Sequence, residues 1–474
     1  MLSNFSDTIC APATVPGTGA ISIVRISGAG AIAVAGRIVT LNRGSASELP
    51  GGSIRLGKVM DGCEVLDEVM LAIFRAPKSY TGEDSVEIYC HASSYIVSRL
   101  LELLCAEGCR MALPGEFTQR AYVGGKMDLA QAEAVADVIA SSSAVAHKVA
   151  MNQMRGGYSR ELAALRSQLL ELTSLLELEL DFSEEDVEFA DRSRLHSLLV
   201  DAVSHCTRLS DSFRLGNALR NGVPVAIVGA PNSGKSTLLN SLLGEDRAIV
   251  SDVPGTTRDT VEETMTLGGV LFRFIDTAGI RESSDKIERL GVERSMRKIS
   301  EAGIVLVVLD STASEESLRD VVSLVAWKVA FGEQKVLFLG NKCDELGFNK
   351  NVINSNFIVN CIDNKDIANV RWAECLAISA KTGFGLDELR KWLESCVTDA
   401  VSAGTMVTNA RHAEALRAAA ASLRTVLSGL DSGLPSDLLA EDLRAALSSL
   451  GSITGEISTD EVLGEIFGKF CIGK

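Results

Sequence analysis

The chain has 474 residues, 46% of them hydrophobic and 23% charged, which is typical of a globular protein of about two to four domains. Its 46 Lys and Arg against 62 Asp and Glu give a net charge of −16, which argues against a broad nucleic-acid surface. No apolar run approaches the roughly 18 residues of a membrane span, and Met1–Asp7 does not resemble a secretion signal, so we expect a cytoplasmic protein without membrane contact. The eleven cysteines are scattered, with only Cys105 and Cys109 close together, which favours free thiols over a zinc site.

Residues 1–122 have the pattern of an α+β domain. Alternating hydrophobicity predicts strands over Ala20–Ile26, Val69–Phe74 and Ser85–Cys90. Apolar residues at three- and four-residue spacing predict a helix over Tyr95–Ala106.

The next stretch, residues 123–221, and the last, residues 398–474, both have a helical pattern. They are rich in Leu and Ala, with apolar residues at helical spacing. The predicted helices are Leu129–Ala150, Arg160–Leu180, Arg192–Leu219, Asn409–Leu430 and Ser436–Leu450. Since domain termini often lie close together, we expect one discontinuous helical domain that an inserted domain interrupts. Two separate helical pieces are the alternative.

The inserted stretch, residues 222–397, alternates strands with loops and helices. Short apolar strands are predicted over Val223–Val228, Val270–Ile275, Ile304–Leu309, Lys335–Leu339 and Cys375–Ile378. This alternation predicts an α/β domain with a parallel sheet covered by helices on both faces.

A phosphate-binding loop follows the first of these strands. Gly229–Ser236 matches G-x-x-x-x-G-K-[ST] and opens a predicted helix over Ser236–Leu243, which is the context that this motif requires. Backbone N–H groups of such a loop surround phosphates. Lys235 would reach the β- and γ-phosphates, and the Ser236 hydroxyl would coordinate Mg²⁺.

Three further motifs follow in the order found in G proteins. Asp276-Thr277-Ala278-Gly279 comes after a strand, so Asp276 could orient Mg²⁺ and Gly279 could sense the γ-phosphate. Asn341-Lys342-Cys343-Asp344 resembles the guanine-specific N-K-x-D motif, in which the aspartate accepts hydrogen bonds from the base. Ser379-Ala380-Lys381 matches the last guanine-contacting loop. Together these motifs predict a Ras-like, GTP-binding P-loop domain.

The position after Asp276–Gly279, where Ras-type proteins carry the glutamine that orients water, is Ile280. Another group must therefore support hydrolysis. Asn232 could bind a cation beside the phosphates, where an arginine finger would otherwise act. Glu288 could act on water directly or through a second water, although spacing alone favours an exposed charge on a helix.

Several segments together resemble the MnmE family, the TrmE-type branch of the TRAFAC GTPases. These segments are the phosphate-binding loop, Ser251–Asp259, Asp276–Arg294, the C-terminal Cys471-Ile472-Gly473-Lys474, Thr81–Asp84, Pro114–Phe117 and Lys126–Ala134. The resemblance spans nearly the whole chain. It implies an N-terminal domain that binds a folate one-carbon carrier, such as 5-formyl- or methylene-tetrahydrofolate, and forms a homodimer. It also implies G domains that K⁺ activates.

The same resemblance assigns the nucleotide site residue by residue. It implies K⁺ ligands at Asn232, Ser251, Val253 and Thr256, Mg²⁺ ligands at Ser236 and Thr257, and a catalytic acid at Glu288. The implied GTP-binding residues are Asn232, Ser233, Gly234, Lys235, Ser236, Thr237, Ser251, Asp252, Val253, Pro254, Gly255, Thr256, Thr257, Asp276, Thr277, Ala278, Gly279, Asn341, Lys342, Asp344, Ser379, Ala380 and Lys381.

For folate, the resemblance implies Arg25, Glu87, Lys126 and Lys474. Arg25 is in phase with apolar residues on its strand, which is costly unless it faces a ligand or forms a salt bridge. Cys471 is a catalytic thiol in one interpretation and a small buried apolar residue in the other. Ala92-Ser93-Ser94 departs from the family's glycine-rich pattern, which puts the local pocket geometry in question.

The function that the resemblance implies is tRNA modification. With the FAD-dependent partner MnmG (GidA), in a heterotetramer, such a protein adds an aminomethyl or carboxymethylaminomethyl group at C5 of the wobble uridine. Folate supplies the carbon and ammonium or glycine supplies the nitrogen, with tRNA bound largely through the partner. The alternatives are a regulatory or ribosome-assembly GTPase without this chemistry, and a folate enzyme whose G domain only holds the dimer together.

Overall fold

The computed structural model describes residues 6–181, 192–244, 263–275, 299, 301–326, 334–346, 374–401, 405–457 and 460–473. The chain divides into two compact units. The first unit comprises Met1–Ile139, Met151–Thr207 and Glu414–Lys474, and the second comprises Ala140–Ala150 and Arg208–Ala413. Within the described residues, no helix is both long and apolar enough to cross a bilayer.

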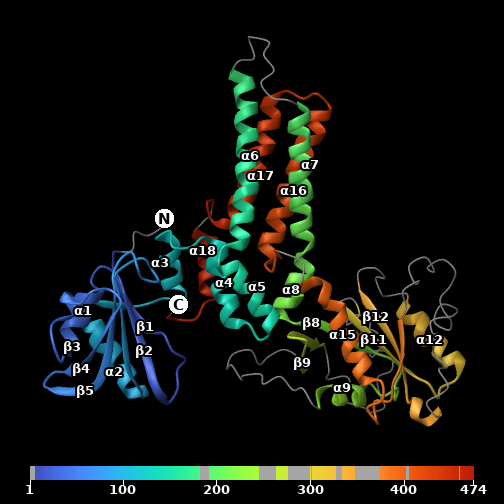
Figure 1. The fold of residues 1–474 in the computed structure, drawn as a ribbon, viewed down its shortest axis with the longest axis horizontal. Helices are drawn as coiled ribbons and strands as arrows, with labels where there is room; N and C mark the ends of the chain where they lie inside the picture. Colours follow the sequence, from blue (N-terminus) through green and yellow to red (C-terminus); the bar gives the residue numbers. More distant parts are fainter. Residues whose placement is uncertain are drawn as a thin grey trace. The chain divides into compact units, whose positions relative to one another are not determined.

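The first unit contains a seven-stranded sheet (Figure 1). Its strands are β1 (Thr8–Pro12), β2 (Gly19–Ser27), β3 (Val39–Leu41), β4 (Ser53–Asp61), β5 (Glu64–Phe74), β6 (Ser85–Ala92) and β7 (Cys109–Met111). They are ordered β3-β4-β5-β6-β2-β1-β7, and every neighbouring pair is antiparallel except β1 and β7. The three predicted strands are confirmed in β2, β5 and β6. The ends of β2 and β6 differ slightly from the prediction, whereas β5 begins at Glu64 and not at Val69.

One face of this sheet forms the core of the domain. Val24, Ile26, Val86 and Ile88 alternate with exposed or half-buried residues and pack beneath α1 (Ala31–Ile38) and α2 (Ser94–Ala106). The period of two along each strand sends the intervening side chains to the opposite face. The predicted helix over Tyr95–Ala106 is confirmed as α2.

Two more helices of the first unit flank the C-terminal segment. They are α3 (Glu116–Val123) and α4 (Leu129–Ala140). The last helix, α18 (Asp460–Gly468), packs its Leu463 and Phe467 into a small apolar core with α4. The Tyr122 hydroxyl donates to the Gly455 carbonyl at 2.6 Å, so this end of the helical segment is tied to α3.

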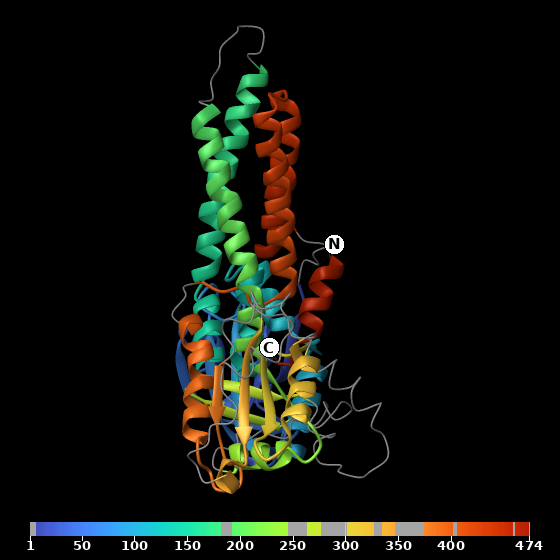
Figure 2. The same cartoon turned by 90° about the vertical axis from the view of Figure 1, so that its right-hand side faces the viewer.

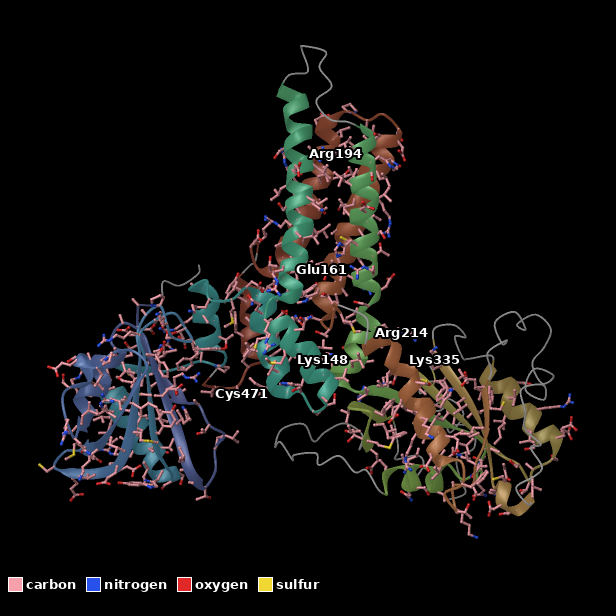
Figure 3. All side chains as sticks on the ribbon, viewed as in Figure 1. Lys148, Glu161, Arg194, Arg214, Lys335 and Cys471 are labelled. Carbon is pink, nitrogen blue, oxygen red and sulfur yellow. The ribbon has the colours of Figure 1, made fainter. Side chains whose placement is uncertain are left out.

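Four long helices run side by side in the rest of the first unit (Figures 1 and 2). They are α6 (Gly157–Asp181), α7 (Arg192–Asp211), α16 (Ala410–Asp431) and α17 (Ser436–Thr454). Glu161 of α6, labelled in Figure 3, accepts a hydrogen bond from His205 of α7 at 2.7 Å. Helices from both sides of the inserted stretch therefore build one bundle, as predicted.

Two predicted helices are each divided in the structure. The predicted helix Leu129–Ala150 ends as α4 at Ala140, and α5 (Ala144–Met154) begins after Ser143, whose hydroxyl accepts from the Ala146 N–H at 3.2 Å. This is an N-cap, which starts a new helix. The predicted helix Arg192–Leu219 is also divided, into α7 and α8 (Phe213–Asn221), at Ser212. The Ser212 hydroxyl does not cap α8; it donates to the Leu209 carbonyl at 2.6 Å and accepts from the Val407 N–H at 3.1 Å.

The second unit contains a six-stranded sheet. Its strands are β8 (Val223–Val228), β9 (Glu263–Leu267), β10 (Val270–Phe274), β11 (Ile304–Asp310), β12 (Lys335–Asn341) and β13 (Glu374–Ala377), ordered β13-β12-β11-β8-β10-β9. All pairs are parallel except β9 with β10. The five predicted strands are therefore confirmed as parallel. The sheet also has an edge strand that was not predicted, β9, which runs antiparallel to β10 because Gly268-Gly269, both with positive φ, makes a tight hairpin turn.

Helices cover both faces of the second sheet, as predicted. Apolar residues of α8, α9 (Lys235–Leu243) and α15 (Leu386–Val401) pack on one face. Those of α12 (Glu315–Ala326) pack on the other. The nearly unbroken apolar sequence of β11 follows from this double burial.

Candidate functional site

The loop Gly229–Gly234 connects β8 to α9 at the carboxyl end of the parallel sheet. Gly229 and Gly234 have φ of +157° and +97°. A Cβ on Gly229 would lie 2.2 Å from the Val308 carbonyl oxygen, and one on Gly234 would lie 2.1 Å from Nδ2 of Asn341. Both positions therefore require glycine, and the loop leads its backbone directly into the N-terminus of α9.

The ammonium of Lys235 lies across this loop. Its Nζ donates to the carbonyls of Gly229 at 3.0 Å and Ala230 at 2.6 Å. The side chain is therefore folded back over the loop, on the side where phosphates bind in P-loop proteins. Ser236 and Thr237, at the start of α9, are exposed.

The Asn341 side chain joins the phosphate-binding loop to the loop that follows β13. Its Nδ2 donates to the Ser233 carbonyl at 2.8 Å, and its Oδ1 accepts from the Ala380 N–H at 2.9 Å. The Ser241 hydroxyl of α9 donates to the Ala380 carbonyl at 2.7 Å. Three predicted motifs are thus brought together by one buried amide.

The neighbouring Lys342 is paired with an acidic residue that sequence reasoning missed. Its Nζ lies 2.6 Å from Oδ2 of Asp310, the last residue of β11. Burial raises the pKa of Asp310, but hydrogen bonds from Lys342 and Thr312 outweigh it and hold that pKa below its ordinary value. A carboxylate that ends a buried strand at the carboxyl edge of a parallel sheet was the signal available in the sequence.

Asp344, the predicted guanine acceptor, lies in the short helix η3 (Cys343–Leu346) that follows Asn341 and Lys342. Ser379 and Ala380 are buried, whereas Lys381 is exposed. Asn232 is exposed and has φ +61°. The other predicted nucleotide, metal and catalytic residues lie outside the described residues: Ser251, Asp252, Val253, Pro254, Gly255, Thr256, Thr257, Asp276, Thr277, Ala278, Gly279 and Glu288.

A second group of predicted residues lies in the first unit, around Arg25. Arg25 pairs across the strands with Glu87, and its Nη2 lies 2.9 Å from Oε1 of that residue. The guanidinium also lies over the rings of Tyr80 at 5.5 Å and Phe117 at 5.7 Å. Arg25 therefore has a salt-bridge partner, and it lies on the sheet face opposite the helix-covered core.

The C-terminal tail reaches the same place. Nη1 of Arg25 lies 3.5 Å from the Gly473 carbonyl. Gly473 has φ +97°, and a Cβ there would lie 2.0 Å from the Pro12 carbonyl oxygen of β1. The Cys471 carbonyl accepts from the Gly115 N–H at 3.4 Å. Backbone contacts therefore hold the tail against the N-terminal domain, although Lys474 itself lies outside the described residues.

The side chain of Cys471, labelled in Figure 3, is exposed. The interpretation of this cysteine as a small buried apolar residue is therefore wrong. Phe470, in the small apolar core, and Gly473, against Pro12, anchor the tail on either side of Cys471. The Cys471 thiol therefore lies outside the core.

Lys126 contacts the loop between β5 and β6. Its Nζ donates to the Pro77 carbonyl at 2.9 Å. Tyr80, whose hydroxyl pairs with Thr118 at 2.8 Å, belongs to this loop and contacts Arg25 through its ring. Tyr80 and Phe117 were missed as candidates, although each lies within or next to a segment that carries the family resemblance.

The segment Ala92-Ser93-Ser94, which departs from the family pattern, comes directly after His91, and His91 is held by Asp67. Oδ2 of Asp67 accepts from the His91 N–H at 2.8 Å, and its Oδ1 lies 2.7 Å from Nδ1 of the His91 ring. β6 then ends at Ala92, and α2 begins at Ser94. Ala92-Ser93-Ser94 thus forms an ordinary strand-to-helix connection.

A strand, a glycine-bounded phosphate loop, a helix and an N-K-x-D motif joined to that loop define a P-loop GTPase. Known families match nearly the whole chain. The family described as GTP-binding protein TrmE N-terminus matches residues 8–126, and the MnmE helical domain matches residues 129–471. The chain belongs to the MnmE family of tRNA-modification GTPases.

The relatives in curated collections agree over full length. A tRNA modification GTPase MnmE from Porphyromonas gingivalis is 50% identical over 99% of this chain and 98% of its own. One from Bacteroides thetaiotaomicron is 48% identical over 99% of both chains. Among solved structures, Era in complex with MgGDPNP and a segment of 16S ribosomal RNA is 34% identical over 36% of this chain and 56% of its own, with a TM-score of 0.27. Because the chain belongs to this family over its full length, it is a GTP-hydrolysing enzyme of tRNA modification.

Proposed function

We propose that this GTPase is Mg²⁺-dependent and K⁺-stimulated and that it works with MnmG. Together they would add an aminomethyl or carboxymethylaminomethyl group at C5 of the wobble uridine, with a folate-borne carbon. The observation that carries the proposal is the pairing of two sites in one chain. One is the phosphate-binding loop tied to the guanine motifs by Asn341, and the other is the Arg25 cluster with the C-terminal tail against it. A GTPase that only acted as a switch would not need the second site, around Arg25.

In the nucleotide site, the loop N–H groups and Lys235 would bind the phosphates, and Ser236 would hold Mg²⁺ together with Thr257. Asp344 would accept hydrogen bonds from guanine and so exclude adenine. Glu288 would act on the attacking water.

Potassium would replace an arginine finger. Asn232 supports this role because its exposed amide lies in the phosphate-binding loop itself, on a backbone of positive φ. A cation held there would neutralise charge that develops on the phosphates. Backbone oxygens of Ser251, Val253 and Thr256 would be the remaining K⁺ ligands.

The test compares GTP turnover in K⁺ and Na⁺ buffers of equal ionic strength. The unaltered chain should be faster in K⁺, and Asn232→Ala should lose that difference while still binding GTP. Asn240→Ala, an exposed asparagine on α9, is the matched control and should keep it. Equal turnover in both salts for the unaltered chain would remove the basis for the potassium assignment.

The folate site would be built from Arg25, Glu87, Lys126 and Lys474. Cationic side chains suit the glutamate carboxylates of a folate, and Glu87 suits the N–H groups of a pterin. Cys471, exposed on the tail, would be available as a thiol near the bound carbon carrier. These assignments rest on the Arg25 cluster and on the family.

Calorimetric titration with 5-formyl-tetrahydrofolate tests this site. Arg25→Ala should weaken folate binding by at least about tenfold, the loss of roughly 1.4 kcal/mol, and leave GTP turnover intact. Arg55→Ala on β4 removes an exposed arginine of the same domain and should change neither. Undiminished folate binding by Arg25→Ala would exclude this location.

Homodimerisation would use the open face of the N-terminal sheet. Leu56, Met70, Tyr89 and Ile23 lie opposite one another in a row across four neighbouring strands. Leu56 is 62% exposed, which is costly for a leucine on a flat sheet face. A second copy of this chain would cover the row, next to the Arg25–Glu87 pair.

We further propose the domain boundaries 1–122, 123–221, 222–397 and 398–474, with the second and last forming one helical domain. The family's substrate is tRNA, and the ten described cysteines are all free thiols, which fits a reducing compartment. We therefore propose a cytoplasmic location.

A further inference from the structure

A carboxylate outside the N-K-x-D motif lies directly beside it. Asp310 ends β11, and the parallel register places it opposite Asn341, the last residue of β12. Its Oδ2 accepts from Nζ of Lys342 at 2.6 Å. The side chains of Asp310 and Lys342 are only 21% and 30% exposed, so this ion pair is partly shielded from water and interacts more strongly than one on the open surface.

Asp310 is held in one orientation by the segment that follows β11. Its Oδ1 accepts from the Thr312 N–H at 3.0 Å and from the Thr312 hydroxyl at 2.6 Å. The Ser311 N–H donates to the Asn341 carbonyl at 3.0 Å, which continues the pairing of β11 with β12 beyond the strands. Because each carboxylate oxygen has its own partner, Asp310 is a fixed acceptor for the lysine.

Lys342 needs a fixed partner because its backbone is strained. Its φ is +64°, and Lys342 and Asn232 are the two non-glycine residues with positive φ in the part of the chain that the structure describes. A residue other than glycine keeps this conformation only where the surrounding contacts hold it. The strained turn comes between Asn341, whose amide bonds the phosphate-binding loop, and Asp344 in η3.

The backbone bonds around this turn leave the side chain of Lys342 to the ion pair. The Cys343 N–H donates to the Ile378 carbonyl at 3.3 Å, and the Glu345 N–H donates to the Lys342 carbonyl at 3.1 Å. These bonds fix the residues that follow Lys342, whereas the Asp310 carboxylate holds its ammonium group. The conformation of the turn therefore depends on a residue 32 positions earlier in the chain.

We propose that Asp310 is a positioning residue for guanine recognition, which holds Lys342 and with it the strained N-K-x-D turn. In this turn the Asn341 amide reaches the phosphate-binding loop while Asp344 stays at the base. Loss of the carboxylate relaxes the turn, so the base loses contacts while the phosphates, bound by the other loop, keep theirs. This role rests on the guanine contact proposed above for Asp344.

The first test measures nucleotide release from the full chain with a GTP analogue that is fluorescent on its ribose. Asp310→Asn keeps the shape of the side chain but removes the charge that holds Lys342. It should release the analogue about tenfold faster and raise the KM for GTP, because a charge-assisted hydrogen bond is lost. The single-turnover rate of hydrolysis at saturating GTP should stay within about twofold, since the phosphate contacts remain.

Asp320→Asn is the matched control, because Asp320 is an exposed carboxylate on α12. It should change neither release nor KM. Lys342→Met removes the same ion pair from its other side and should also speed release, and it decides the test if Asp310→Asn does not fold. An unchanged release rate in Asp310→Asn overturns the proposal.

A second measurement shows whether the loss falls on the base. Inosine lacks the 2-amino group that guanine presents to Asp344, so the unaltered chain should bind GTP more tightly than inosine triphosphate. Asp310→Asn should narrow this preference several-fold. An equal loss for both nucleotides would give Asp310 a structural role only and would overturn the proposal.

A double-mutant cycle tests the strain at Lys342. Glycine adopts positive φ freely, so Lys342→Gly removes both the strain and the partner of Asp310. In that background Asp310→Asn should change the release rate by less than about twofold. An effect of equal size in both backgrounds contradicts the proposed role of the ion pair.

Asp344→Ala separates the role of Asp310 from the proposed function. This variant should lose more GTP affinity than Asp310→Asn. If Asp344→Ala binds GTP as tightly as the unaltered chain, the guanine assignment is wrong and the role of Asp310 is overturned with it. If Asp344→Ala loses affinity and Asp310→Asn does not, only the role of Asp310 is overturned.

Discussion

The amide of Asn341 shows how one side chain can serve two motifs. An asparagine amide has donors and an acceptor on a single planar group, and here its Nδ2 and Oδ1 bond the backbones of two different loops. A shift of either loop would leave a buried polar atom without its partner, which costs about 1–3 kcal/mol. The phosphate-binding and guanine-binding loops are therefore positioned together.

Gly234→Ala should weaken GTP binding through this contact. A Cβ at 2.1 Å from Nδ2 would displace the Asn341 amide, and the backbone of Gly234 is in a conformation that alanine rarely adopts. Strain of this kind costs on the order of 1–3 kcal/mol, or roughly ten- to a hundredfold in affinity. Titration with a fluorescent GTP analogue measures this loss of affinity.

Gly433→Ala is the control, because Gly433 has a similar positive φ of +70° with nothing within 4 Å of its added Cβ. It should cost folding stability but leave GTP affinity unchanged. Equal affinities for Gly234→Ala and the unaltered chain would show that the amide can move without consequence.

Residue roles were predictable where a motif fixes them and unpredictable where the fold makes the contact. Lys235 and Asn341 could be placed from spacing, since the P-loop and N-K-x-D patterns specify their positions. The bond from Asn341 to Ser233 joins residues 108 positions apart, and no local pattern encodes it. Arg25 could be identified as an unusual charge on an apolar strand, but its contacts with Tyr80 and Phe117 depend on the folded loops.

Helix α3 contains an ion pair between two buried residues, Glu116 and Arg120. Glu116 begins the helix, and its carboxylate accepts from the Leu113 N–H at 2.8 Å, from Arg110 at 2.7 Å and from Arg120 at 2.9 Å. Arg120 lies one turn along α3 and is buried. The carboxylate thus fixes the turn that leads into the helix and compensates a buried cation at once.

This arrangement predicts a pH-dependent stability of the N-terminal domain. Burial raises the pKa of Glu116, but hydrogen bonds from Arg110, Leu113 and Arg120 hold it below its ordinary value of 4.5. Since the folded pKa is depressed, the stabilisation is complete above pH 4.5 and is lost as pH falls through the folded pKa. Glu116→Gln should cost on the order of 3 kcal/mol at pH 7 and progressively less in acid.

Calorimetric melting of both chains between pH 7 and pH 3 measures this difference. The gap between the two melting temperatures should narrow below about pH 4.5, because the unfolded chain then binds a proton that the folded carboxylate, with its lowered pKa, does not yet bind. Glu64→Gln, an exposed carboxylate on β5, is the control and should show no gap. A gap that stays constant with pH would mean that charge at Glu116 does not stabilise α3.

Helices and strands with a clear hydrophobic pattern were predicted well. Those whose ends are set by a capping residue, or whose conformation depends on a neighbouring strand, were not. The strands of the second unit follow from their apolar runs. The division between α4 and α5 escaped notice because a run of serines carries no proline or glycine, although Ser143 is an N-cap in the structure. β9 was missed because its alternation is only partly apolar, and its pairing with β10 holds it in place.

At the scale of the whole molecule, the open face of the N-terminal sheet determines how two copies of the chain would associate. The row Leu56, Met70, Tyr89 and Ile23 is continuous with the next row, where Ile54, Ala72, Glu87 and Arg25 lie opposite one another. An apolar surface therefore adjoins the charged pair proposed for folate. If a second copy covers this surface, the assembly brings two such sites close to one interface.

Leu56→Asp should separate the dimer. Because a twofold interface uses the same surface twice, one substitution removes two buried leucines at about 1.5–3 kcal/mol each, or more than roughly a hundredfold in dissociation constant. Size-exclusion chromatography with light scattering should show twice the chain mass for the unaltered protein and a single chain mass for Leu56→Asp. Leu170→Asp, at an exposed leucine of α6, should remain dimeric. Retention of the dimer by Leu56→Asp, with dissociation in Leu170→Asp, would place the interface on the helical bundle instead of the sheet.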